Sequence, residues 1–221
     1  MRRRWIITVF VRIPLCLVLF SVTLVTLLRW VPVRHTPMML KRTLQFRQEG
    51  GYHPTQEWVS LDEVSPELIK AVVLAEDQKF YSHSGFDWAE LRGMWEAHRK
   101  EGAPLRGCST ISQQTAKNVF TLGTRTWLRK GCEVWWTLLI ELLWGKDRIM
   151  EVYLNVVEMG PDLYGMQAAS LEYYGIPALE LSTKEAVYLV VCLPEPLRST
   201  PFRLSGTNQR RRSRILAEMI R

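Results

Sequence analysis

Two glutamates carry the strongest indication of chemistry in this chain. Glu76 continues an apolar stripe at helical spacing, which Ile69, Val72 and Val73 form. Glu133 stands at the start of a long apolar run. An apolar face disfavours the ionised form of a carboxylate, which suits a group that exchanges protons with a substrate. The pattern predicts acid–base catalysis. A structural carboxylate paired with a basic residue is the alternative for Glu76.

The stretch between the two glutamates is polar and cationic. Residues 106–118 read RGCSTISQQTAKN, and Arg129 and Lys130 come shortly before Glu133. Two carboxylates around a sugar bond are compatible with hydrolysis, but hydrolysis gives no role to a set of fixed cations. Together with Arg106 and Lys117, these cations are suited to clamp an anionic leaving group such as a diphosphate. The residues therefore favour glycosyl transfer from a lipid diphosphate.

Other kinds of site find less support in the composition. The four histidines show no H-E-x-x-H spacing, so a zinc hydrolase is not indicated. Cys108, Cys132 and Cys192 form no C-x-x-C, so no disulfide framework is indicated. The net charge of +7 is concentrated at residues 2–4 and 210–214. We interpret the C-terminal cluster as a solubilising surface. Anionic lipid or nucleic acid is the alternative partner, and no nucleic-acid-binding module supports the second.

Residues 13–28 form an uncharged apolar run, which residues 5–11 extend beyond Arg12. This length predicts one membrane-spanning helix, with Arg12 snorkelling to the inner face. The arginines at 2–4 predict an inside N-terminus, and Trp30 then lies at the outer interface. A cleaved signal peptide is the alternative, but no small-residue cleavage site follows Leu28. We therefore expect an uncleaved anchor and an extracytoplasmic domain.

The elements that position the two glutamates are predicted to be helices. Residues 31–60 predict a tether with a lead-in strand or loop. Ser65, Pro66 and Glu67 suit a helix start, as N-cap, first-turn proline and first-turn acid. Further helices are expected at 109–120, 127–145, 148–158 and 183–193. Glu141 is interpreted as a structural ion-pair partner, and the tryptophans near it as core or membrane-facing. We predict a mainly α protein divided at 1–30, 31–60 and 61–221.

Four ordered motifs over roughly residues 40–221 resemble those of the peptidoglycan glycosyltransferases. They are Glu76-Asp77-x-x-Phe80-x-x-His83-x-Gly85, Arg106-Gly107-x-Ser109-Thr110-Ile111-Ser112-Gln113-Gln114-x-x-Lys117-Asn118, Arg129-Lys130-x-x-Glu133 and Arg148-Ile149-x-Glu151-x-Tyr153-Leu154-Asn155. Cys108 departs from the family pattern, which usually has a second glycine there. The resemblance implies a lysozyme-like, two-lobed glycosyltransferase domain behind one N-terminal transmembrane helix.

The resemblance also implies a role for each motif. Glu76 would be the general base that deprotonates the 4-hydroxyl of the acceptor, lipid II. The freed oxygen would attack C1 of the growing chain with inversion to a β-1,4 bond, and undecaprenyl diphosphate would leave. Glu133, with Lys117, Arg129 and Lys130, would stabilise that diphosphate. The substrate cleft would be shaped by Phe80, His83, Arg106, Ser109, Thr110, Gln113, Gln114 and Asn118.

A divalent cation, Mg²⁺ or Mn²⁺, is the cofactor compatible with this resemblance, and no organic cofactor is implied. Asp77 is the candidate ligand, and pairing with a nearby cation is its alternative role. The expected partners are lipid II, the growing lipid-linked strand, and proteins of cell division or cell-wall synthesis; nucleic acid is not expected. The expected location is the cell inner membrane, single-pass, with a cytoplasmic N-terminus and a periplasmic catalytic domain.

Three rival functions differ in what they require. A lytic transglycosylase or lysozyme-like muramidase needs one acid and no diphosphate clamp, so the cations argue against it. An inactive anchored scaffold would have no use for both Glu76 and Glu133. A bifunctional penicillin-binding protein would carry S-x-x-K, S-x-N and K-T-G motifs, which the sequence lacks.

Overall fold

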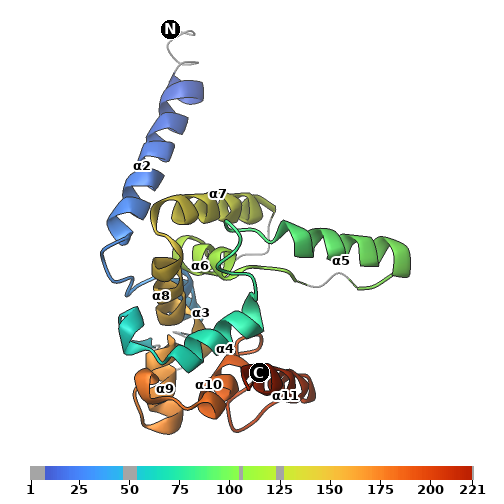
Figure 1. The fold of residues 1–221 in the computed structure, drawn as a ribbon. Helices are drawn as coiled ribbons and strands as arrows, with labels where there is room; N and C mark the ends of the chain where they lie inside the picture. Colours follow the sequence, from blue (N-terminus) through green and yellow to red (C-terminus); the bar gives the residue numbers. More distant parts are fainter. Residues whose placement is uncertain (1–7, 47–53, 105–106, 123–126, 221) are drawn as a thin grey trace.

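The computed structural model describes residues 8–46, 54–104, 107–122 and 127–220. A π-helical turn, Thr8–Arg12, continues into α2, Ile13–Leu28, and the two form one 21-residue segment with a hydropathy of 2.3. This segment projects from one end of the helical body (Figure 1). Its length and composition suffice to cross a membrane, as the sequence predicts for an anchor.

The C-terminal half of α2 is docked on the body through α7, Trp127–Leu143, and the start of α8, Lys146–Val156. The indole nitrogen of Trp144 donates to the carbonyl of Val25 at 2.7 Å. Arg148 donates to the carbonyl of Leu28 at 2.7 Å. The last carbonyls of a helix lack hydrogen-bond partners within it, and Arg148 supplies such a partner at the end of α2. The apolar helix is therefore fixed to the domain at its C-terminal end.

Residues 31–60 differ from the predicted strand or loop, because they contain a helix. Helix α3, Pro37–Phe46, follows Thr36, whose hydroxyl accepts a hydrogen bond from the Met39 N–H at 3.2 Å. Proline is favoured at the first position of a helix, since its missing N–H needs no partner there. Pro37 therefore begins a helix within the segment predicted to be a tether. The only strand described in this segment is β1, Thr55–Gln56.

The helices that carry the motif residues begin close to where the sequence predicts. Helix α4, Pro66–Glu76, is capped by Ser65, whose hydroxyl accepts from the Leu68 N–H at 3.1 Å. Helix α6, Ile111–Phe120, begins two residues later than predicted, because Thr110 caps it in a reciprocal pair with Gln113. Helix α10 spans Thr183–Val190, and Ser182 caps it in the same way.

Several elements were not predicted. They are α5, Trp88–Glu101; α9, Met166–Tyr174; α11, Gly206–Met219; the 3₁₀ turns Leu61–Glu63 and Ala178–Glu180; and the strands β2, Glu158–Gly160, and β3, Leu163–Tyr164. The strands form a small sheet in the order β1–β3–β2, with β1 parallel and β2 antiparallel to β3. Next to it, Gly165 has φ 82° and packs so closely that a Cβ would lie 2.8 Å from the Asn155 carbonyl. Glycine is therefore required there.

The core lies among α4, α6, α8 and α10, where Leu68, Ile111, Ile149 and Leu189 are fully buried. Helix α7 covers α6, and α11 packs against both α4 and α10. In Figure 1 the upper part of the body, around α6 and α7, adjoins α2, and the lower part contains α9, α10 and α11. The mainly α fold behind one N-terminal apolar helix is confirmed. Helix α4 lies between the two parts, and its last residue is Glu76.

Candidate active site

Glu76 is held by one side chain on each carboxylate oxygen. Arg211 of α11 donates to Oε1 at 2.6 Å, and Gln114 of α6 donates to Oε2 at 2.7 Å. The Glu76 side chain is 12% exposed. The carboxylate therefore has a cation and an amide beside it, in place of the purely apolar environment expected from the sequence. Arg211 belongs to the C-terminal cluster interpreted as a solubilising surface, and for this arginine that interpretation is wrong.

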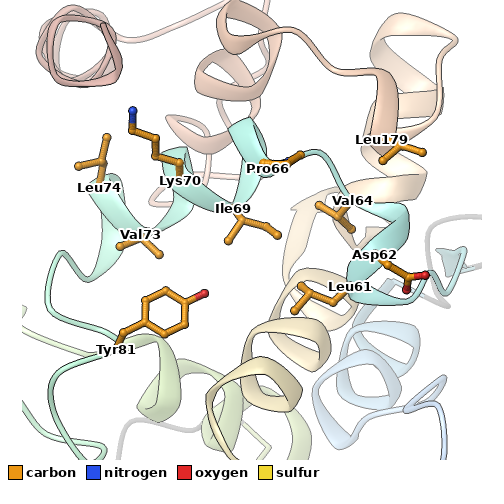
Figure 2. A pocket seen from close by; sticks show the side chains of 10 residues that line it. All are labelled: Leu61, Asp62, Val64, Pro66, Ile69, Lys70, Val73, Leu74, Tyr81 and Leu179. Carbon is orange, nitrogen blue, oxygen red and sulfur yellow. The ribbon is translucent and has the colours of Figure 1, made fainter. Parts of the chain in front are cut away.

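The apolar stripe that precedes Glu76 is divided between the core and an open groove. Val72 is fully buried, whereas Ile69 and Val73 are half-buried and line a groove of about 580 Å³ along α4. Figure 2 shows their side chains pointing into this groove, with Tyr81 on its opposite side. Its walls are completed by Leu61, Asp62, Val64, Pro66, Lys70, Leu74 and Leu179. The side of α4 that leads to Glu76 therefore packs partly against the core and is partly open to the groove.

The loop after α4 is braced by Asp77 and His83. Asp77 Oδ2 accepts the Ile111 N–H at 3.0 Å, which ties this loop to the start of α6. The Gly85 N–H donates to His83 Nδ1 at 3.2 Å, so the proton of a neutral ring lies on Nε2, which is 3.0 Å from both Asp77 oxygens. Phe80 is fully buried beneath the loop, with Lys146 Nζ 4.5 Å from its ring centre. Phe80 and His83 therefore shape the cleft by supporting this loop.

The carboxylates offer no ready site for a divalent cation. Both oxygens of Asp77 are engaged by His83 and Ile111, and both oxygens of Glu133 face cationic side chains. In the described ranges, no group of three His, Cys, Asp or Glu side chains is placed to hold a metal ion. Asp77 is hydrogen-bonded to His83 and to the Ile111 N–H, and its role as a metal ligand stays a prediction. The involvement of Mg²⁺ or Mn²⁺ stays a prediction, and no step below depends on it.

Some of the predicted cleft residues in and before α6 are buried and support the helix, whereas others are exposed or reach Glu76. The Thr110 hydroxyl donates to the Gly85 carbonyl at 2.7 Å, and Gln113 Oε1 accepts the Thr110 N–H at 3.1 Å. Thr110, Gln113 and Asn118 are buried, so they hold the helix start and its packing. Ser109 is exposed, and Gln114 reaches Glu76. Arg106, another predicted cleft residue, lies outside the described residues.

Glu133 pairs with Arg129 and Lys130, and Lys117 lies near these two cations. Glu133 is 3% exposed, forms an ion pair with Arg129 one helical turn earlier, and lies 3.5 Å from Lys130. Burial lowers the pKa of Lys117, and the charge of Arg129 lowers it further, while Glu158 and Glu76 act in the opposite direction. Burial, Arg129 and Lys117 likewise lower the pKa of Lys130. These cations repel one another, so a bound anion would stabilise them.

Lys117 connects this cationic cluster to Glu76. It lies on α6, four residues after Gln113 and on the same side of the helix. The charge of Arg129 lowers the pKa of Lys117, and the charge of Glu76 raises it. Within the part of the chain that the structure describes, Lys117 forms no ion pair. A half-buried ammonium between a base and two further cations is well placed to receive the negative charge of a leaving group.

Other motif residues have structural roles. Glu141 accepts from the Ser112 hydroxyl and pairs with Lys146 at 2.6 Å, so its interpretation as a structural ion-pair partner is confirmed. Tyr153 is fully buried, and burial raises its pKa well above the usual value. Cys108, at the usual glycine position, is half-buried, and burial raises the pKa of its thiol.

The sequence did contain a signal for Arg211. Arg211, Ile215 and Met219 recur at i, i+4 and i+8, and the last two are buried. An arginine on the buried side of a helix needs a partner, unlike its exposed neighbour Arg210. No such signal exists for Arg148, whose hydrogen bonds to the end of α2 depend on the tertiary structure.

A carboxylate, Glu76, near the cations Lys117, Arg129 and Lys130, on a helical fold behind an apolar N-terminal helix, is the arrangement expected of a class of enzyme: transferases whose leaving group is anionic. Residues 42–220 match the family model described as Transglycosylase, and the chain belongs to this family. It is 43% identical over 203 residues to a biosynthetic peptidoglycan transglycosylase of Rhodospirillum centenum, covering 92% of this chain and 86% of that protein.

Relatives from other bacteria carry the same description. A biosynthetic peptidoglycan transglycosylase of Stutzerimonas stutzeri is 46% identical over 186 residues, covering 84% of this chain and 76% of the relative. Another, of Bacteroides thetaiotaomicron, is 42% identical over 201 residues, covering 90% of this chain and 80% of the relative. The similarity therefore extends over the domain and not over the motifs alone.

Proposed function

We propose that this protein polymerises peptidoglycan glycan strands, transferring the growing lipid-linked chain onto lipid II with inversion to a β-1,4 bond. Membership of the transglycosylase family and relatives described as biosynthetic peptidoglycan transglycosylases support this function. The observation that carries the mechanism is the arrangement of Glu76, Lys117 and the Glu133 cluster. One carboxylate is placed for proton transfer, and the cations next to it are placed for a diphosphate.

In the proposed reaction, Glu76 accepts the proton of the 4-hydroxyl of lipid II. The hydroxyl oxygen forms a bond to C1 of the donor sugar, and the bond from C1 to the diphosphate oxygen breaks. That electron pair leaves on undecaprenyl diphosphate, whose added charge Lys117, Arg129 and Lys130 stabilise. Glu133 holds Arg129 and Lys130 in place through its ion pairs. It neither contacts the diphosphate nor acts as a base. Proton transfer of this kind contributes about 10²–10⁴-fold to the rate.

The second candidate, a lytic or lysozyme-like enzyme, is not favoured by these contacts. Cleavage of a finished strand releases no diphosphate, so the cations Lys117, Arg129 and Lys130 would have no substrate charge to balance. The same cluster suits the synthetic reaction. Biosynthesis is therefore the function that the site supports better.

The protein acts at the cell envelope, and its apolar N-terminal helix fits membrane anchoring. We propose further that the N-terminus is cytoplasmic and the catalytic domain periplasmic, because the arginines precede or enter the span. The cationic site would then meet its lipid-linked substrate at the outer face of the inner membrane. Partners among cell-division or cell-wall synthesis proteins stay a prediction.

One experiment separates the two candidate functions. The purified full chain is incubated in parallel with labelled lipid II and with finished peptidoglycan. We expect long strands and undecaprenyl diphosphate from lipid II, and no release from peptidoglycan. Penicillin should not inhibit the reaction, because the chain has no acyl-transfer serine motif. Anhydro-muropeptides released from peptidoglycan, without polymer from lipid II, would establish the lytic function instead.

A further inference from the structure

One guanidinium nitrogen of Arg211 joins the C-terminal helix to the end of α4. Its Nη2 donates to Glu76 Oε1 at 2.6 Å and to the Ala75 carbonyl at 2.7 Å. The Ala75 carbonyl belongs to the last turn of α4, where backbone oxygens lack partners inside the helix. Arg211 therefore satisfies the backbone of α4 and its terminal side chain together.

The position of Glu76 explains why a cation is needed there. A carboxylate at the C-terminal end of a helix faces the negative end of the helix dipole, which disfavours its ionised form. The Glu76 and Arg211 side chains are 12% and 17% exposed, so water and salt screen their attraction only weakly. Lys117 adds a second positive charge from α6. The Arg211 charge thus offsets the cost of ionising a base at this site.

The contacts also fix the orientation of the carboxylate. Arg211 of α11 holds one oxygen, and Gln114 of α6 holds the other. Each carboxylate oxygen has two lone pairs, so each can still accept a hydrogen bond from a substrate hydroxyl. Gln114 lies in turn 3.5 Å from the hydroxyl of the buried Tyr153. The base is therefore held without being blocked.

The neighbours of Arg211 do not share this placement. Arg212 donates to the Tyr188 hydroxyl at 3.1 Å, and Arg210 is exposed. Arg214 is exposed and lies 3.9 Å from Glu218. Arg211 is the member of this cluster that is oriented toward α4, on the same side of α11 as the buried Ile215.

We infer that Arg211 is a positioning residue for the glycosyl transfer: it holds and orients the Glu76 carboxylate and does not itself bind substrate. The inference rests on the proposed role of Glu76 as the base. Because Arg211 acts through Glu76, its loss should slow the chemical step and leave the binding of lipid II nearly unchanged. A residue that only stabilised the fold would lower the amount of active enzyme and not the turnover of each folded molecule.

The test compares the full-length variants Arg211→Ala and Arg211→Lys with the exposed control Arg210→Ala. We expect Arg211→Ala to lower kcat by about 10- to 100-fold, the range for one charge-assisted hydrogen bond, with KM for lipid II nearly unchanged. Arg211→Lys should recover part of the loss, because it keeps the charge. Guanidinium ion, added well below denaturing concentrations, should raise the kcat of Arg211→Ala and not that of the control.

Three outcomes would overturn the inference. The first is a wild-type kcat in Arg211→Ala together with an inactive Glu76→Gln. This result would overturn the role of Arg211 and leave the role of Glu76 as the base intact. The second is a loss in Arg211→Ala and Arg211→Lys alike, without guanidinium rescue and in proportion to lost folded protein. The third is wild-type activity in Glu76→Gln, which would remove the proposed base itself. Active-site titration and thermal unfolding of every variant distinguish the second outcome from a change in kcat.

Discussion

The indole nitrogen of Trp135 donates a hydrogen bond to the hydroxyl of Ser21 at 3.2 Å. Ser21 lies about two turns before the end of α2, which corresponds to about 10 Å along the helix axis. We predict from this contact that part of α7 lies at the depth of the acyl chains near the C-terminal end of the span, because the apolar segment is long enough to cross a membrane. Leu138 and Leu142 on α7 are 44% and 79% exposed, and lipid would cover such side chains there.

This depth can be tested by tryptophan fluorescence. We expect lipids brominated in their acyl chains to quench Trp135, because bromine and the indole ring would lie at the same level. The full chain and Trp135→Phe are reconstituted in such vesicles, and the difference between their spectra isolates Trp135. Aqueous iodide is the matched control quencher. Quenching of the difference spectrum by iodide and not by brominated lipid would place α7 in water.

The orientation of the span is a separate prediction. The N-terminus should be cytoplasmic and the C-terminus periplasmic, because the arginines at 2–4 and Arg12 hold the N-terminal end inside. An alkaline phosphatase fused after residue 221 should be active in a bacterial host, since this enzyme folds only outside the cytoplasm. An active cytoplasmic reporter at that site, beside an inactive phosphatase, would reverse the orientation.

Loss of the cationic cluster should weaken handling of the lipid-linked diphosphate. We expect Lys117→Ala and Arg129→Ala each to reduce kcat/KM for lipid II by about 10- to 100-fold, since charge-assisted contacts to phosphate are strong. Steady-state polymerisation assays give this ratio. The control is Lys100→Ala, which removes an exposed charge from α5. An equal loss in the control would mean that only net charge matters.

The cluster should also give the reaction a specific sensitivity to alkaline pH. Burial and Arg129 lower the pKa of Lys117, so its ammonium loses charge at a lower pH than an exposed lysine does. Affinity for an anionic group therefore falls as the pH rises through that lowered pKa. Arginine stays protonated, so Lys117→Arg should reduce this fall. Lys130 titrates in both proteins, so part of the fall will remain.

The measurement is KM for lipid II at neutral pH and at about pH 10, where an ordinary lysine is near its pKa. The ratio of the two values is compared among the wild-type protein, Lys117→Arg and the exposed control Lys100→Arg. We expect the ratio of KM at about pH 10 to KM at neutral pH to be smallest for Lys117→Arg. The same ratio in all three proteins would show that Lys117 does not contribute to the rise of KM at alkaline pH.

Asn155 should matter for stability and not for proton transfer. It is 1% exposed, and its amide accepts the Val59 N–H at 2.9 Å and donates to the Val59 carbonyl at 2.8 Å. Asn155→Ala would leave both backbone groups without a partner, which should lower the free energy of unfolding by about 3 kcal/mol. Denaturant unfolding measures the change. Gln209→Ala, at an exposed position of α11, should change it by less than about 0.5 kcal/mol.

Much of the fold could be predicted because its signals are local. Ser65 and Pro66 define the start of α4 through their own side chains, and the uncharged run at residues 13–28 defines the span. The residue types also identified the two glutamates and the cations Lys117, Arg129 and Lys130. Local signals were weaker in residues 31–60, where Pro37 was compatible with a loop or with a helix start, and the structure has a helix.

The relationships that make a site of these residues were decided by the tertiary structure. Arg211 and Glu76 are 135 positions apart, and Trp135 and Ser21 are 114 apart. Helical periodicity shows which side of a helix is apolar, but it does not show which helix will cover that side. The sequence alone determined the helices with strong local signals, such as α4 and α6, the apolar N-terminal segment and the family motifs. The packing of α11 on α4 decided that Glu76 is held by an arginine. The packing of α7 on α2 decided that the apolar helix is fixed to the domain. Only the tertiary structure decides such contacts, because they join helix faces that are distant in the chain.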